Sequence, residues 1–280
     1  MKTARISFYR LVPYLWVIPM GLIAFTTIYP IFFTLNVSLK SHKAFVLNRF
    51  ALALDPTLQN FLRAWTYARI GKYFWNSLIV TAGAVLVLWV VCSMAGYAFA
   101  QMKFRGNRAL FLLILAGMMI PIQVVLVPFY KLVLDLHLLN KHVGLILSYG
   151  AFFLPFGVYL MTAYYTNIPS ELPEAAKVDG ASVWQIYTYI MLPMGRPALA
   201  TLGILNTLYA WNDLLISLLV LQERELRTLM VGIAALRGEY TTDVPLMAAG
   251  LILGALPVIL LFLVFQAQIS KGMTIGAVKG

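Results

Sequence analysis

The chain has 280 residues, of which 61% are hydrophobic and 11% are charged, and its formal net charge is +11. This composition, with a mean hydropathy of +0.85, excludes an ordinary soluble domain, because such a domain would expose large apolar surfaces to water. The basic residues are scattered over loops, so we expect them to face anionic membrane lipid and expect no nucleic acid partner.

Six long apolar stretches predict six transmembrane helices, and therefore an all-α, polytopic membrane protein. A helix needs about 20 residues to cross hydrocarbon, and these stretches lack the alternation of barrel strands. The spans are expected near residues 11–36, 74–100, 109–131, 143–166, 197–220 and 247–270. We expect one transmembrane domain over residues 1–280, with Cys92 as a small packing residue in the second span.

The orientation of the chain follows from its loops. The first predicted span is too long and too rich in proline for a typical cleaved signal peptide, so we expect it to stay as an anchor. Basic residues are almost equally frequent on the two sides of the membrane, but Lys103, Arg105 and Arg108 crowd the short loop after the second span. Density in short loops decides orientation, so both termini are predicted to be cytoplasmic.

Two longer loops, at 38–73 and 223–243, fall on the opposite side. In the first, Asp55 and Pro56 are suited to the cap and first position of a helix. Each loop is either a solvated connector or a docking surface, and the spacing leaves both interpretations open.

The chain carries no signs of catalysis. No phosphate-binding loop of the form G-x-x-x-x-G-K-[ST] is present, so ATP is expected on another polypeptide. No serine, histidine and acid arrangement is evident, and we predict no catalytic residue. Asp135, His137 and His142 have a spacing too weak to predict a metal site.

A polar segment between the fourth and fifth spans, residues 167–196, predicts two short helices in water. Ser170 is placed to cap the first helix, and Pro173 is tolerated in its first turn. Gly180 supplies a left-handed stop at its end. The first helix is therefore expected to be about two turns long.

The second helix of this segment is expected to begin after Ser182. Gln185 follows three residues later, which is the spacing of a capping box. Pro193 is expected to end the helix, because the residue before a proline resists helical geometry.

The fifth span contains a polar stripe. Asn206, Tyr209, Asp213 and Ser217 share one helical face, with Asn212 beside it. An ionisable residue within a span normally faces a partner or a wet cavity, so this face is predicted to line a pathway suited to a neutral, hydroxyl-rich solute. The alternative is that Asp213 reaches toward the outer interface.

Motifs along most of the chain resemble one family of membrane proteins. The polar segment resembles the EAA loop of the permeases of binding-protein-dependent ABC importers, through Glu174-Ala175-Ala176, Asp179-Gly180-Ala181, Ile190, Leu192, Pro193 and Pro197. The C-terminal part is similar to the carbohydrate branch, of the maltose and glycerol-phosphate type, through Gly238-Glu239-Tyr240, Asp243, Met247-Ala248-Ala249, Leu256-Pro257, Phe265-Gln266 and the ending from Lys271 to Gly280.

This resemblance implies a type I ABC importer permease in the inner membrane of a bacterium or archaeon. Such a permease pairs with a second, usually different permease, and a solute-binding protein delivers a carbohydrate or polyol to it. A cytoplasmic ATPase dimer holds ATP and magnesium and drives transport, so this chain is expected to bind no cofactor.

The resemblance also assigns roles to residues of the coupling loop at 167–196. Glu174 would be the acidic contact with the ATPase, and Ala175 and Ala176 would allow close approach. Gly180 would give the turn that orients the helix, and Asp179 belongs to the same surface.

Two alternative functions remain open. A permease for a non-sugar solute would share the Glu174 loop without the Gly276-Ala277-Val278-Lys279-Gly280 ending. An ion-driven secondary transporter would not need the capped helix pair and would commonly show several ionisable groups within its spans. A membrane enzyme is a more distant third.

Overall fold

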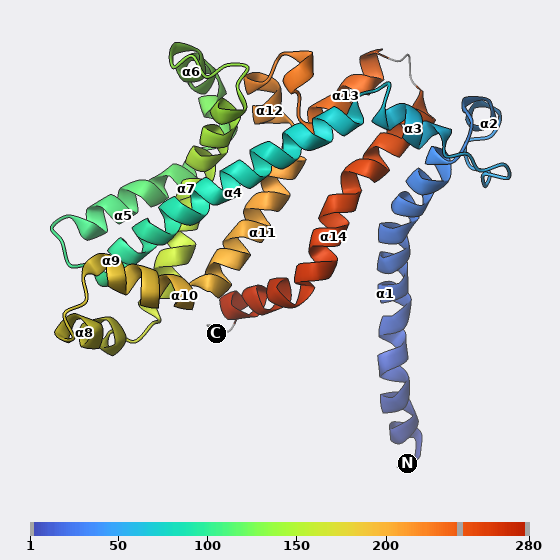
Figure 1. Ribbon diagram of the computed structural model, residues 1–280. Coiled ribbons are helices and arrows are strands. Elements are labelled where there is room, and N and C mark those ends of the chain that lie inside the picture. Colours follow the sequence, from blue (N-terminus) through green and yellow to red (C-terminus); the bar gives the residue numbers. More distant parts are fainter. Residues whose placement is uncertain (1–2, 240–242, 278–280) are drawn as a thin grey trace. The chain divides into compact units, whose positions relative to one another are not determined.

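The computed structural model describes residues 3–239 and 243–277, and it describes side chains from Trp16 to Leu236 and from Asp243 to Gln266. These residues form helices joined by loops, without any strand (Figure 1). The predicted all-α class is confirmed. The chain forms two compact units, residues 1–70 with 235–255, and residues 71–234 with 256–280.

Within the described residues, four helices are long and apolar enough to cross a membrane. They lie where the first, second, fourth and sixth spans are predicted: α1 (Thr3–Ser38), α4 (Ile70–Gln101), α7 (His142–Thr166) and α14 (Val244–Ala277). The remaining two predicted spans are helical but broken.

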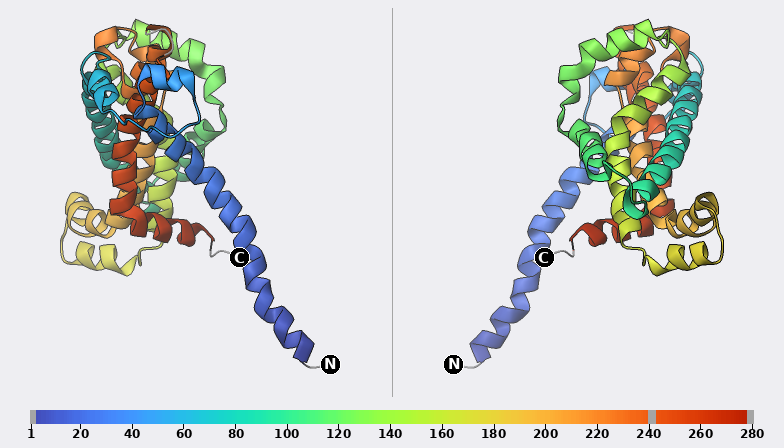
Figure 2. Two further views of the ribbon diagram at one scale, coloured as in Figure 1. Left: turned by 90° about the vertical axis from the view of Figure 1, so that its right-hand side faces the viewer. Right: turned by 90° about the vertical axis from the view of Figure 1, so that its left-hand side faces the viewer.

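The third predicted span, 109–131, is a bent pair of helices and not one straight helix. It consists of α5 (Asn107–Ala116), a 3₁₀ turn, η1 (Gly117–Met119), and α6 (Ile122–Asp135), with an angle of 104° between the two parts. The bend is visible in Figures 1 and 2. Pro121 explains it, because the preceding Ile120 is extended, with φ −90° and ψ 115°, as a residue before proline prefers.

The larger unit holds a mainly apolar core between α4 and α7. Cys92 of α4 is fully buried and lies against Gly157 of α7, in the packing role predicted for it. A Cβ at Gly96 would lie 2.5 Å from the Cβ of Met161. Small residues thus let the two helices approach closely, as is common between transmembrane helices.

The same unit contains a series of short helices. After α7 come α8 (Glu171–Val178), α9 (Val183–Ile186), a π-helical turn, η2 (Tyr187–Met191), and α10 (Leu192–Met194). Then follow α11 (Arg196–Asn212), α12 (Leu215–Val220), a 3₁₀ turn, η3 (Arg224–Leu226), and α13 (Leu229–Glu239), which extends into the other unit. Figures 1 and 2 show α8 and α12 at opposite ends of the larger unit.

In the smaller unit, hydrogen bonds from two buried side chains hold the loop that follows α1. Lys40 is only 2% exposed, and its Nζ donates to the carbonyls of Asn48 (3.0 Å) and Arg49 (3.2 Å). The Nδ2 of Asn60 donates to the carbonyls of Ser38 (2.8 Å) and Lys40 (2.7 Å). This loop carries the short helix α2 (His42–Leu47) and is followed by α3 (Gln59–Trp65).

The start of α3 differs from the prediction. The helix begins at Gln59 and not at Pro56, and Leu58 precedes it without a side-chain cap. The Asp55–Pro56 pair therefore lies in the loop, where the hydrogen bonds of Lys40 and Asn60 determine the backbone path.

We expect Lys40→Met to loosen the loop at 41–58. The change keeps the length of the side chain but removes the donor to two carbonyls, and an unsatisfied buried group costs about 1–3 kcal/mol. Amide hydrogen exchange of the loop is expected to accelerate by about 10-fold to 100-fold. Lys43→Met, at an exposed position of the same loop, is the control. Equal exchange in the two variants would contradict a structural role for the Lys40 ammonium.

Candidate functional site

The first short helix of the predicted coupling loop is α8, and its two ends differ in how well they were predicted. Ser170 has helical dihedrals, φ −66° and ψ −19°, and its side chain caps nothing, so the predicted cap is wrong. A capping residue needs an extended backbone. Gly180 has φ +86°, which confirms the left-handed stop.

The end of α8 is a Schellman motif. The amide of Gly180 donates to the carbonyl of Lys177 at 3.1 Å, and the amide of Ala181 donates to that of Ala176 at 2.9 Å. An L residue at position 180 would be strained, although nothing lies within 4 Å of its Cβ. The geometry of the turn therefore depends on the backbone of Gly180 and not on its surroundings.

The second short helix begins as predicted and ends differently. The amide of Gln185 donates to Ser182 Oγ at 3.3 Å, and the amide of Ser182 donates to Gln185 Oε1 at 2.8 Å, which confirms the capping box. Pro193 does not end the helix. The chain widens into the π turn at Tyr187–Met191 shortly before the proline and continues through α10 toward α11.

The five predicted coupling residues lie on or directly after α8. Glu174, Ala175, Asp179 and Gly180 are exposed, and Ala176 is half-buried against the core of the larger unit. Within the described part of the chain, the Glu174 carboxylate has no ion-pair partner, Lys177 included.

The surface of α8 has two sides. Glu174 and Lys177 line a crevice toward the end of α4, next to Gln101 and Lys103. On the other side, Val178 is 88% exposed, which sequence reasoning missed. The spacing of Glu171, Ala175 and Val178 at i, i+4 and i+7 was the available signal for this outward face.

The segment after α8 is firmly packed onto two long helices. Tyr187 is buried, and its hydroxyl lies 2.7 Å from Ser93 Oγ of α4. Met191 shares the core with Tyr165 of α7, whose hydroxyl would lie 2.6 Å from a Cβ at Gly195. Packed side chains therefore connect the segment after α8 with both α4 and α7.

The fifth predicted span, 197–220, is divided between α11 and α12. Asp213 is extended, with ψ 131°, and ends α11. Its Oδ2 accepts hydrogen bonds from the Ser217 amide and the Tyr149 hydroxyl, both at 2.9 Å, and its Oδ1 accepts one from the Ile216 amide at 3.4 Å. The carboxylate thus caps the start of α12. The continuous helical face that was predicted for the stripe is therefore interrupted at Asp213.

Only part of the predicted stripe lines a pocket. Tyr209, Asn212 and Asp213 line one open pocket of about 550 Å³, together with apolar residues of α11 and α12. Asn206 and Ser217 are buried, at 3% and 0% exposed, and do not line this pocket. Ser217 Oγ lies 2.8 Å from the Tyr149 hydroxyl, whereas Asn206 Nδ2 has no hydrogen-bond partner among the described residues.

Tyr209 and Asn212 are the exposed polar residues of the pocket. Tyr209 is half-exposed, and its ring stacks edge-on against Phe153 of α7, with centroids 4.3 Å apart. Asn212 donates to the Leu208 carbonyl at 2.7 Å. The pocket therefore offers a positioned aromatic ring with a hydroxyl, an amide oxygen and the edge of a carboxylate. Among the described residues, no group of three His, Cys, Asp or Glu side chains is placed to hold a metal.

Comparison with known proteins places the chain in a family. The model of the binding-protein-dependent transport system inner membrane component matches residues 92–274. The chain is 33% identical to the melibiose/raffinose/stachyose import permease protein MelC of Bacillus subtilis, over 100% of both chains. It is 33% identical to the arabinooligosaccharides transport system permease protein AraQ of Halalkalibacterium halodurans, over 95% of this chain and 96% of that one.

A solved structure has the same fold. It is the crystal structure of a bacterial ABC transporter involved in the import of the acidic polysaccharide alginate, with a TM-score of 0.84, 24% identity, and coverage of 92% of this chain and 96% of the other. The chain therefore belongs to the family of binding-protein-dependent transport system inner membrane components, as a non-enzymatic ABC permease subunit whose ATPase is a separate polypeptide.

Proposed function

We propose that this chain is one membrane-spanning subunit of an ATP-driven importer for a neutral carbohydrate or related polyol. The observation that carries the proposal is the full-length similarity to MelC, a permease named for the import of melibiose, raffinose and stachyose. The importer would comprise a second permease, a cytoplasmic ATPase dimer with ATP and magnesium, and an extracytoplasmic solute-binding protein. It would lie in a bacterial or archaeal inner membrane, with both termini of this chain in the cytoplasm.

The coupling step would begin at α8. Glu174, Ala175, Ala176, Asp179 and Gly180 would contact an ATPase subunit, and the exposed Val178 would add apolar area to the contact. ATPase closure on ATP would then displace α8, and the packing of Tyr187 and Tyr165 would pass the motion to α4 and α7. Such coupling needs two states of the bundle that bind the ATPase with different affinities.

The substrate contact would lie in the pocket at the end of α11. The Tyr209 ring would stack on the apolar face of a sugar, and its hydroxyl and the Asn212 amide oxygen would bind sugar hydroxyls. Asp213 would position α12 and reach the solute with its remaining acceptor capacity. No arginine or lysine lies between residues 197 and 220, which favours a neutral solute over a phosphorylated one.

Tyr209→Phe is expected to raise the KM for a neutral oligosaccharide by about 3-fold to 10-fold, since one neutral hydrogen bond contributes about 0.5–1.5 kcal/mol. The measurement is ATP-dependent uptake by proteoliposomes that contain the complete importer and its binding protein. Tyr159→Phe, at a half-exposed position of α7 outside the pocket, is the control.

Two results would contradict the proposed function, and a third would contradict the proposed pocket. Uptake by the chain alone under an ion gradient would identify a secondary transporter. ATPase stimulation by a binding protein loaded with a peptide, and not with a sugar, would identify a non-sugar permease. An equal KM for Tyr209→Phe and wild type would remove Tyr209 from the pathway.

A further inference from the structure

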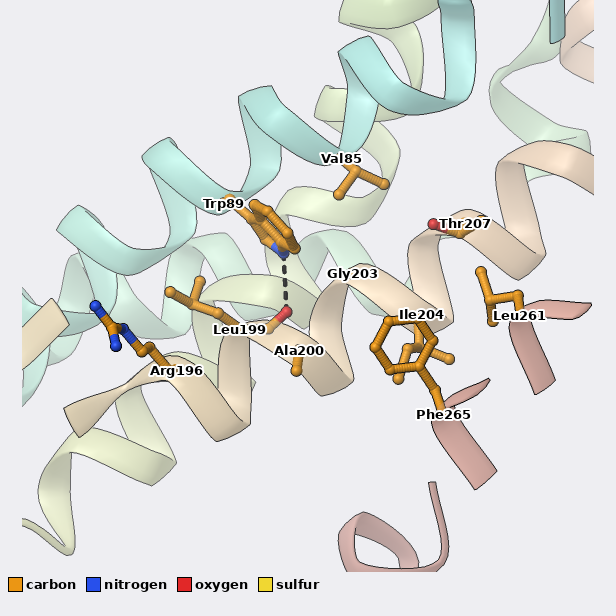
Figure 3. A pocket seen from close by; sticks show the side chains of 10 residues that line it. All are labelled: Val85, Trp89, Arg196, Leu199, Ala200, Gly203, Ile204, Thr207, Leu261 and Phe265. Atoms are coloured by element: carbon orange, nitrogen blue, oxygen red, sulfur yellow. Dashed lines mark hydrogen bonds between the residues drawn. The ribbon is translucent and has the colours of Figure 1, made fainter. Parts of the chain in front are cut away.

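A second cavity of the larger unit lies between α4, α11 and the part of α14 after residue 255, and we call it the α11 groove (Figure 3). Its volume is about 400 Å³, within the range of small-molecule pockets. Most of its lining is apolar, including Trp89, Leu199, Gly203, Ile204, Leu261 and Phe265. The proposed transport function uses none of these residues.

The depth of the groove comes from Gly203 and Trp89. A Cβ at Gly203 would lie 2.8 Å from the Trp89 ring, so the indole packs directly on the α11 backbone. The indole Nε1 donates to the Leu199 carbonyl at 2.8 Å, as the dashed line in Figure 3 marks. The polar atom of Trp89 is thereby occupied, and the ring presents apolar surface to the groove.

One end of the groove is positively charged. Arg196, the first residue of α11, lies at the opposite end of the lining from Leu261 and Phe265 (Figure 3). Its side chain is exposed, and no acidic side chain in the described part of the chain pairs with it. Arg196 follows the segment from α8 to α10 directly, so the proposed function, on which this step rests, places it at the cytoplasmic interface.

These features decide what the groove can hold. A sugar would need several hydrogen-bonding groups, whereas the lining offers the Thr207 hydroxyl and Arg196 beside apolar side chains. A long alkyl chain with an anionic head matches both the apolar walls and the cation at one end. Basic pockets between transmembrane helices on the cytoplasmic side bind anionic lipid headgroups in this way.

We propose that the α11 groove is a binding site for an anionic phospholipid of the cytoplasmic leaflet. One acyl chain lies along Leu199, Gly203 and Phe265, and the phosphate pairs with the Arg196 guanidinium. A guanidinium suits this role because it binds phosphate through two parallel hydrogen bonds.

The test uses the complete importer, reconstituted with phosphatidylglycerol that carries a diazirine in one acyl chain. Light-induced cross-links are expected on peptides that contain Trp89, Leu199 or Phe265. After washing in neutral detergent, Arg196→Gln is expected to retain about 5-fold less phosphatidylglycerol than wild type, the effect of one cation near an anionic surface. Arg196→Lys is expected to retain more than Arg196→Gln.

Two further variants separate the contribution of the lipid headgroup from that of the acyl chain. Arg105→Gln removes the same charge from an exposed loop position outside the groove and is expected to leave retention unchanged. Ala200→Phe fills the groove without changing charge and is expected to abolish the acyl-chain cross-links. Lipid retention is measured without transport, so it tests the groove even where sugar uptake fails.

Several outcomes would overturn the proposal. They are equal retention in Arg196→Gln and wild type, equal loss in Arg105→Gln and Arg196→Gln, and equal cross-linking of phosphatidylcholine and phosphatidylglycerol. Cross-links at the groove between this chain and the second permease, in place of lipid cross-links, would identify a protein interface there.

Discussion

Glu174→Lys is expected to abolish sugar uptake while the chain remains in the membrane. The Glu174 side chain is exposed and has no partner among the described residues, so reversing its charge removes no internal contact. At the proposed ATPase interface, a lysine in place of the acidic contact would face like charge, which costs several kcal/mol, or about 100-fold or more in affinity. The measurement is uptake together with the amount of ATPase subunit that copurifies with the permease.

The matched control for this change is Glu223→Lys. Glu223 is also exposed, but it follows α12 at the other end of the larger unit (Figure 1). This variant carries the same charge reversal and is expected to keep its ATPase subunits, because Glu223 lies away from α8. Wild-type uptake by an assembled Glu174→Lys importer would remove Glu174 from the coupling interface.

Local chemistry made part of the coupling loop predictable from the sequence. Gly180 and the Ser182–Gln185 pair form the predicted turn and capping box, because both motifs depend on residues within one helical turn. The predicted cap at Ser170 is wrong, because the Ser170 backbone is helical and does not adopt the extended conformation that a cap requires. A serine before a short helix is compatible with either the helical or the extended backbone conformation, as Ser170 and Ser182 show.

The positions of prolines predicted helix breaks in one case and not in another. Pro121 bends the third span, whereas Pro193 leaves its helix continuous through a π turn. The difference lies in the surroundings, since Tyr187 and Met191 are buried against α4 and α7 and keep the segment helical. Tertiary packing of this kind is not readable from a single sequence.

The apolar runs predicted the helices, but not the cavities between them. Trp89 and Gly203 are 114 residues apart, and their contact follows from the packing of α4 on α11. The pocket residues Tyr209 and Asn212 were found from their polarity alone. Their separation from Ser217 depends on the break at Asp213, which the assumption of one continuous helix concealed.

Asp213→Ala is expected to reduce uptake strongly while the ATPase subunits remain bound. The change removes the acceptor of hydrogen bonds from Ser217, Ile216 and Tyr149, and hydrogen bonds to a charged group contribute about 1.5–3 kcal/mol each. The loss should displace α12 and the adjoining wall of the pocket. The measurement is the rate and KM of uptake, with the thermal stability of the purified importer recorded in parallel.

A double-mutant cycle with Tyr149→Phe separates positioning from direct contact with the sugar. If Asp213 acts by holding α12, the two single variants lower stability and the double variant lowers it by less than their sum, because the Tyr149–Asp213 bond is lost once. Asp213→Asn keeps an oxygen acceptor and is expected to recover part of the stability. Asp135→Ala, at the exposed end of α6, is the control. Additive losses of stability would mean that the Tyr149–Asp213 bond does not hold α12. A KM effect of Asp213→Ala without any loss of stability would instead assign the Asp213 carboxylate to direct substrate contact.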